Sequence, residues 1–97
     1  MAMEIDVLIF TRHAVEQMFR RRIAAEDVRI VVRTGELIAD YPDDQPYPSR
    51  LILGHVGGRP LHVVLAWEAE TKTGYVVTAY EPDLDLWEPG FRARRKP

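Results

Sequence analysis

The amino-acid sequence predicts an α+β fold in which two N-terminal helices pack on one face of a curved antiparallel sheet. Three observations support this prediction. Amphipathic helical patterns cover residues 11–23 and 24–34, and three apolar runs joined by short turns lie between residues 50 and 81. We therefore expect the element order β-α-α-β-β-β in a single domain over residues 1–83, followed by an irregular basic tail over residues 84–97.

The first helix follows a short β-capable run over residues 5–10 and begins after Thr11, a residue type that favours the N-cap position. Its apolar side chains fall within one half of the helical wheel, and His13 and Gln17 fall on the opposite half. Arg21 flanks the apolar half. Because side chains four positions apart are neighbours on a helix, His13, Gln17 and Arg21 form one row.

The second helix begins at Ala24 or Ala25 and stops at Gly35. Its buried stripe consists of Val28, Val31 and Val32. Residues 36–41 can form a short strand. The three prolines in residues 42–48 then exclude regular structure before the meander begins.

The meander consists of strands over residues 50–56, 61–67 and 75–81. The core-facing residues of its second strand are Leu61, Val63, Leu65 and Trp67. Strand alternation then places His62 on the opposite, open face of the sheet. An imidazole there can act as a general acid or base, because its pKa lies near neutrality. The alternative is a solvated strand histidine that makes one hydrogen bond.

Composition limits the classes of function. A chain of 97 residues with 46% apolar and 29% charged residues forms one globular domain. It has no cysteine, no apolar run long enough to cross a membrane, and no metal-binding or nucleotide-binding motif. We therefore expect a cytoplasmic protein with no cofactor, no bound metal and no membrane partner.

The net charge of −2 argues against strong non-specific binding of polyanions. All but two of the 13 cationic residues are arginine, however, and the planar guanidinium matches phosphate better than an ammonium does. A GC-rich genome, which favours arginine codons, explains the same bias equally well.

Several other polar residues are candidates for a phosphate-handling site. Tyr80 ends the last strand, where its phenol can orient a phosphate, stack on a base, or only pack against the strand end. Arg20 and Arg21 belong to a run of three arginines that can bind phosphate or form a solvated helix face. Arg50 heads the first meander strand and can clamp a phosphate or pair with an acidic residue of the preceding loop.

Two sets of motifs resemble the domain-of-unknown-function 4258 family, over roughly residues 9–82. The helical motifs are Thr11-Arg12-His13-Ala14, Arg21, Ile23, Asp27-Val28 and Gly35. The strand motifs are Arg59-Pro60-Leu61-His62-Val63-Val64 and Val77-Thr78-Ala79-Tyr80-Glu81-Pro82. In element order and size, this family resembles the RelE-like toxins of bacterial toxin–antitoxin pairs. The resemblance implies a RelE/barnase-like fold and metal-independent cleavage of RNA.

The sequence departs from the family pattern at three positions. Gln17 stands where an arginine is common, Arg22 where a glycine is common, and Ala24 where a serine cap is common. The first departure removes a charge from the predicted site.

The resemblance and the residues together predict an endoribonuclease. A base takes the proton of a ribose 2′-hydroxyl, the oxygen attacks the adjacent phosphorus to give a cyclic phosphate, and an acid protonates the leaving 5′-oxygen. The predicted catalytic residues are His62, His13 and Tyr80. The predicted phosphate- and RNA-binding residues are Arg21, Arg20, Arg50 and Gln17. Which group is the acid and which the base stays open.

The expected partners are RNA, with ribosome-bound mRNA as one option, and a cognate antitoxin protein. The alternative is a non-catalytic RNA- or protein-binding module that uses the same sheet face and grips its partner with the tail. The acidic net charge and Gln17 favour this alternative. A degenerate toxin that has kept the fold and lost the site is a third option, and the oligomeric state is left open.

Overall fold

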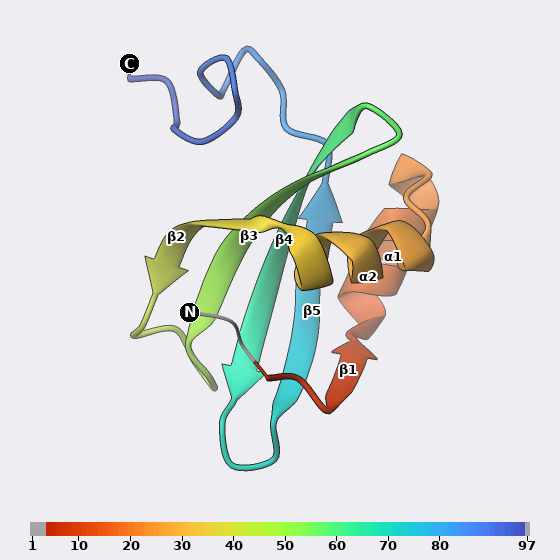
Figure 1. The fold of residues 1–97 in the computed structure, drawn as a ribbon, viewed down its shortest axis with the longest axis vertical. Coiled ribbons are helices and arrows are strands. Elements are labelled where there is room, and N and C mark those ends of the chain that lie inside the picture. The colour runs from red at the N-terminus through yellow and green to blue at the C-terminus, as the bar shows by residue number, and fades with distance from the viewer. Residues whose placement is uncertain (1–3, 97) are drawn as a thin grey trace.

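The computed structural model describes residues 4–96 and has the predicted α+β class (Figure 1). The elements are β1 Val7–Phe10, α1 Arg12–Arg21, α2 Ala25–Thr34, β2 Glu36–Tyr41, β3 Ser49–Val56, β4 Arg59–Glu68 and β5 Thr73–Tyr80. The run at residues 36–41 is thus a strand, one more than the predicted order contained. Within residues 4–96, no helix is long and apolar enough to span a membrane.

The strands form one sheet in the order β1-β5-β4-β3-β2. The strands from β2 to β5 pair antiparallel, as the meander pattern predicted, whereas β1 pairs in parallel with β5. The sheet is therefore mixed rather than wholly antiparallel. The reason is topological, because β1 leads directly into α1 and the chain returns along β5 in the same direction at the end of the meander.

The core lies between the sheet and the two helices. α1 packs along β5, and α2 crosses in front of the sheet and packs on β3 and β4 (Figure 1). The core receives Ala14 and Met18 from α1, Val28 and Val31 from α2, and Ile23 from the segment between the two helices. From β4 it receives Leu61, Val63 and Leu65, three of the four side chains that strand alternation predicted, whereas Trp67 is only partly buried and lies outside this core. Each such side chain stabilises the fold by about 1.5–3 kcal/mol when fully buried, so packing holds the valine-rich α2.

Two of the departures from the family pattern fall on helix caps. Ala14 N donates to Thr11 Oγ1 over 3.1 Å, which confirms Thr11 as the N-cap of α1. At the other end, Arg22 adopts the left-handed backbone conformation with a φ of 56°. A glycine adopts this conformation at lower cost, which is a physical reason for a glycine at this position. Ala24, the N-cap residue of α2, makes no side-chain hydrogen bond.

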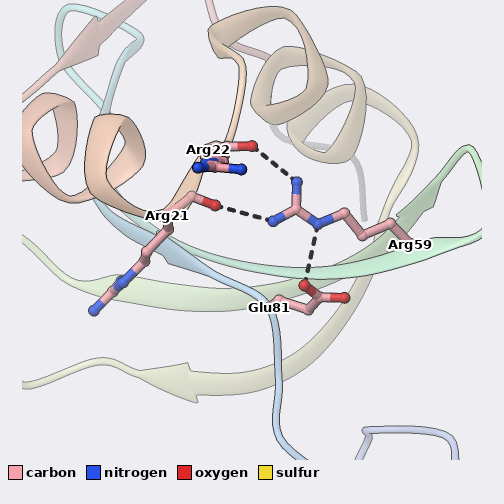
Figure 2. A network of polar contacts seen from close by, with 4 residues as sticks. All are labelled: Arg21, Arg22, Arg59 and Glu81. Atoms are coloured by element: carbon pink, nitrogen blue, oxygen red, sulfur yellow. Dashed lines mark hydrogen bonds and ion pairs between the residues drawn. The ribbon is translucent and has the colours of Figure 1, made fainter.

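Arg59 ties the end of α1 to the end of β5 (Figure 2). Its Nη1 and Nη2 atoms donate to the backbone oxygens of Arg22 and Arg21 over 3.0 and 3.1 Å. Its Nε donates to Glu81 Oε2 over 3.2 Å. The last carbonyls of a helix lack partners within the helix and carry partial negative charge, so a guanidinium stabilises them. These bonds fix the end of α1, and with it Arg21, relative to β5.

We expect Arg59→Ala to lower the free energy of unfolding by about 1–3 kcal/mol, because three hydrogen bonds to one charged group are lost. Urea denaturation followed by circular dichroism measures this change. Arg12→Ala is the matched control, since the Arg12 side chain is 93% exposed and its pair with Glu16 contributes little. Equal midpoints for the two variants would show that Arg59 does not anchor α1.

Candidate functional site

His62 lies on the face of the sheet opposite the helices, as strand alternation predicted, but its side chain is completely buried. Residues that come after β5 cover it. The Trp87 ring packs edge-on against the imidazole, with ring centroids 4.4 Å apart. The Phe91 carbonyl oxygen lies 2.9 Å from His62 Nε2. His62 is therefore closed off from solvent, contrary to the expectation of a histidine on an open face.

The C-terminal tail is an ordered cover on this face. Arg92 forms an ion pair with Glu36 of β2, in which Arg92 Nε lies 2.9 Å from Glu36 Oε2. Trp87 and Arg94 form an isolated β-bridge, and the Arg94 guanidinium lies over the Trp87 ring. Trp87 is 7% exposed. The tail, which the alternative prediction offered to a partner as a grip, thus buries its tryptophan within the domain.

The contacts of His62 determine its protonation. The Phe91 carbonyl can only accept, so Nε2 must carry the hydrogen and Nδ1 of the neutral ring is an acceptor. The Tyr80 hydroxyl, 3.1 Å away, donates to Nδ1. Burial lowers the pKa of His62 below its ordinary value of 6.5, against the smaller opposing effect of the bond to Phe91. The imidazole is therefore neutral at pH 7.

Tyr80 is the accessible member of this pair. The antiparallel register of β4 and β5 places it directly opposite His62, and its side chain is partly exposed. Burial is the largest cause that raises the pKa of Tyr80 above 10.0, Tyr41 raises it further, and Arg94 and Arg21 lower it. The phenol keeps its proton at neutral pH. Its oxygen can accept a second proton while its own moves to His62.

Beside Tyr80, α1 completes the edge of β5. β1 pairs with β5 only from Thr73 to Val76, and among the described residues 4–96 no strand pairs with the second half of β5 on that side. Thr11 Oγ1 donates to the Val76 carbonyl over 2.9 Å, and Arg21 Nη1 donates to the Ala79 carbonyl over 2.8 Å. The Val76 carbonyl also accepts from the Thr11 backbone N–H, whereas at Ala79 the Arg21 guanidinium takes the place of a strand donor.

The predicted row of Gln17 and Arg21 forms part of this edge. Arg21 Nη1 donates to Gln17 Oε1 over 3.1 Å, and Thr78 Oγ1 donates to the same oxygen. Arg21 is exposed, and all of its side-chain hydrogen bonds within residues 4–96 involve Nη1. The other guanidinium nitrogens can donate to an anion.

A shallow hollow lies beside these groups and is lined by Arg21, Arg59, Tyr80 and Glu81. Glu81 balances Arg59 through their ion pair of 3.2 Å, and the Arg21 side chain extends away from that pair (Figure 2). The excess charge of the hollow is therefore the positive charge of Arg21. With the Tyr80 hydroxyl beside it, the hollow offers a guanidinium and a polarised phenol to a phosphate group.

Arg50 does not join this hollow. It pairs with Leu65 across the β3–β4 ladder, and Leu65 faces the helices, so Arg50 lies on the opposite face from His62. There its Nε is 3.6 Å from Asp40 Oδ1. The structure therefore does not bring Arg50 together with His62, because strand parity directs its side chain to the other side of the sheet.

His13 and Arg20 are exposed on α1, and within residues 4–96 neither side chain forms a hydrogen bond with Tyr80 or His62. Helix geometry places His13 about 12 Å along the axis from Arg21, beyond the reach of one phosphate.

Thr78 is not among the predicted site residues, although it shares strand parity with Tyr80. The Phe91 carbonyl on His62 could not be predicted either, since a backbone oxygen has no residue-type signal.

The described part of the chain contains no group of three or more His, Cys, Asp or Glu residues that could hold a metal ion. In comparisons with known proteins, a family model described as a domain of unknown function (DUF4258) matches residues 10–81. No curated protein and no solved structure matches the chain.

The buried His62 makes stability depend on pH. Unfolding returns its pKa to about 6.5, so below that pH the unfolded chain binds a proton that the folded protein resists. We expect the free energy of unfolding to fall as the pH drops below 6.5 toward the lower folded-state pKa, and this contribution to be constant at higher pH.

Urea denaturation across this pH range, with His62→Asn and the exposed His55→Asn, measures the effect. In His62→Asn, the fall of the free energy of unfolding below pH 6.5 (the acid limb) should be smaller than in wild type. In His55→Asn it should be unchanged. The same acid limb in His62→Asn and wild type would contradict the assignment.

Proposed function

This chain belongs to the DUF4258 family, and from that premise we propose that it is a metal-independent endoribonuclease, the RelE-like toxin of a bacterial toxin–antitoxin pair. The observation that supports this most directly is the contact of 3.1 Å between the Tyr80 hydroxyl and His62 Nδ1, beside the free donors of Arg21. A phenol polarised by imidazole can move a proton, and a guanidinium can stabilise charge on a phosphate.

In the proposed reaction, the ribose 2′-hydroxyl gives its proton to the Tyr80 oxygen while Tyr80 gives its own proton to His62 Nδ1. The 2′-oxygen forms a bond to the adjacent phosphorus, and the bond from phosphorus to the 5′-oxygen breaks. The products are a 2′,3′-cyclic phosphate and a 5′-hydroxyl, whose proton comes from water. The imidazolium then returns its proton through Tyr80 to the hydroxide left by that water.

This scheme gives the predicted residues unequal roles. Tyr80 and Arg21 touch the RNA, with Arg21 on the non-bridging oxygens as charge develops there. His62 is completely buried, so it acts through Tyr80 as a positioning residue and proton acceptor. The Phe91 carbonyl at Nε2 stabilises the imidazolium that forms. Gln17 orients Arg21.

The proposed substrate is single-stranded RNA, including mRNA on the ribosome, in the cytoplasm. A tyrosine ring on a sheet face offers a surface on which an unpaired base can stack. The proposed partner is an antitoxin protein that covers the hollow beside Tyr80 and so keeps RNA away from it.

A non-catalytic binding module is the second candidate, and the burial of His62 favours it. Both ring nitrogens are bonded inside the protein, so His62 can serve simply to fix the tail on the sheet. In that case Arg21 would still bind RNA, but no cleavage would depend on Tyr80.

We expect Tyr80→Phe to lower the rate of RNA cleavage by about 10²–10⁴-fold, because the proton relay to His62 is lost while the ring remains. The assay uses purified full-length protein and labelled single-stranded RNA in EDTA, with cyclic phosphate ends detected on the product. Growth arrest on expression of the chain alone gives a second readout.

Tyr75→Phe is the matched control, since Tyr75 is also in β5 but stacks on Tyr47 away from His62. It should cleave at the wild-type rate. Absence of cleavage by wild type, or equal cleavage by wild type and Tyr80→Phe, would reject the enzyme and leave the binding module.

Arg21 and its neighbour Arg20 provide a second test. In the Tyr80→Phe background, which keeps the RNA intact, we expect Arg21→Ala to weaken RNA binding roughly tenfold, the usual loss for one charge-assisted contact. Arg20→Ala should change it little, because Arg20 is exposed and does not line the hollow. Fluorescence anisotropy measures both affinities, and circular dichroism confirms folding. An equal loss in both variants would indicate diffuse charge attraction rather than a site at Arg21.

A further inference from the structure

A larger hollow lies on the other face of the sheet, the face that carries the helices. It has a volume of about 620 Å³ and is bounded by α2, β2, β3 and the segment from Ile5 into β1. This volume is within the range of small-molecule sites. None of its lining residues lines the hollow beside Tyr80, so the two sites are separate.

The floor of this hollow is aliphatic. Its apolar side chains are Ile5, Leu8, Val32, Leu37 and Ile52, and no aromatic ring from the described part of the chain lines it. Leu37 is 46% exposed, so part of this surface faces water. The only hydroxyl side chain of the lining belongs to Thr34, whose Oγ1 donates to the Ile30 carbonyl over 2.8 Å. Such a floor suits a saturated chain better than a base or a sugar.

The rim carries positive charge. Arg29, Arg33 and Arg50 line the hollow, and none of its lining residues within residues 4–96 is acidic. Two acids outside the lining pair loosely with this rim, Glu26 with Arg29 at 3.8 Å and Asp40 with Arg50 at 3.6 Å.

No ion pair within residues 4–96 includes the third guanidinium, that of Arg33. Three positive charges against two negative ones leave one positive charge. The rim therefore matches a ligand with a single negative charge.

We propose that this hollow binds a free single-chain aliphatic anion, a fatty carboxylate. The carboxylate lies between Arg33 and Arg50, whose planar guanidinium groups match its geometry. The chain lies on the aliphatic floor between α2 and β3 and removes that apolar surface from water. The inference is independent of the RNA reaction, because it uses neither Tyr80 nor Arg21.

Titration calorimetry of the full chain with dodecanoate, below its critical micelle concentration, tests the proposal. We expect saturable binding of one dodecanoate per chain. Acetate, which has the charge without the chain, and dodecyltrimethylammonium, which has the chain with the opposite charge, should not bind. Absence of saturable dodecanoate binding, equal binding of the cationic amphiphile, or binding to anionic vesicles but not to free dodecanoate would overturn the proposal.

Variants locate the site. Arg33→Ala and Arg50→Ala should each weaken dodecanoate binding roughly tenfold, the scale of one charge-assisted contact. Leu37→Glu should abolish it, since it places a carboxylate beside the chain, and Leu37 is exposed enough for the fold to tolerate the change. Arg12→Ala is the control and should bind as wild type. If Arg33→Ala, Arg50→Ala and Leu37→Glu all bound dodecanoate as tightly as wild type, the ligand would not bind in this hollow. That conclusion does not depend on the outcome of the RNA assays.

Discussion

The arrangement of this protein depends on the second half of β5, which pairs with β4 on one side and, within residues 4–96, with no strand on the other. A strand edge exposes carbonyl and amide groups that need partners, and β1 supplies them only as far as Val76. α1 lies along the remaining edge, where Arg21 donates to the Ala79 carbonyl. The same contact brings Arg21 to the side of the sheet that carries Tyr80. The candidate site thus arises where a helix completes a sheet.

Features set by a local period could be predicted from the sequence. The face of His62, the core residues of β4 and the pairing of Gln17 with Arg21 are consequences of a repeat of two or of 3.6 residues. The face of Arg50 could not be predicted. Leu51, Ile52 and Leu53 are all buried, so this part of β3 is buried on both faces. A strand buried on both faces has no polar alternation to show its orientation.

The burial of His62 was equally hidden, because it depends on a segment far along the chain. Trp87 and the Phe91 carbonyl reach the imidazole after the turn beyond β5. Their sequence, rich in proline and glycine, indicates only an irregular tail. A buried neutral imidazole with both nitrogens bonded carries little desolvation penalty, so the fold can keep it. His62, the proton acceptor of the proposed relay, is therefore buried, and the partly exposed Tyr80 lies between it and the RNA.

The acceptor for His62 Nε2 is a main-chain atom, and this has an evolutionary consequence. Any residue type at position 91 offers the same carbonyl, so natural selection for that contact acts on spacing rather than on side-chain identity. Phe91 has a φ of 61°, a conformation that glycine or asparagine adopts more readily, so drift toward those residues would be tolerated. One inserted or deleted residue between Tyr80 and position 91 would instead displace the carbonyl by about 3.5 Å. Among relatives that keep this contact, we expect the segment between Tyr80 and position 91 to have a constant length.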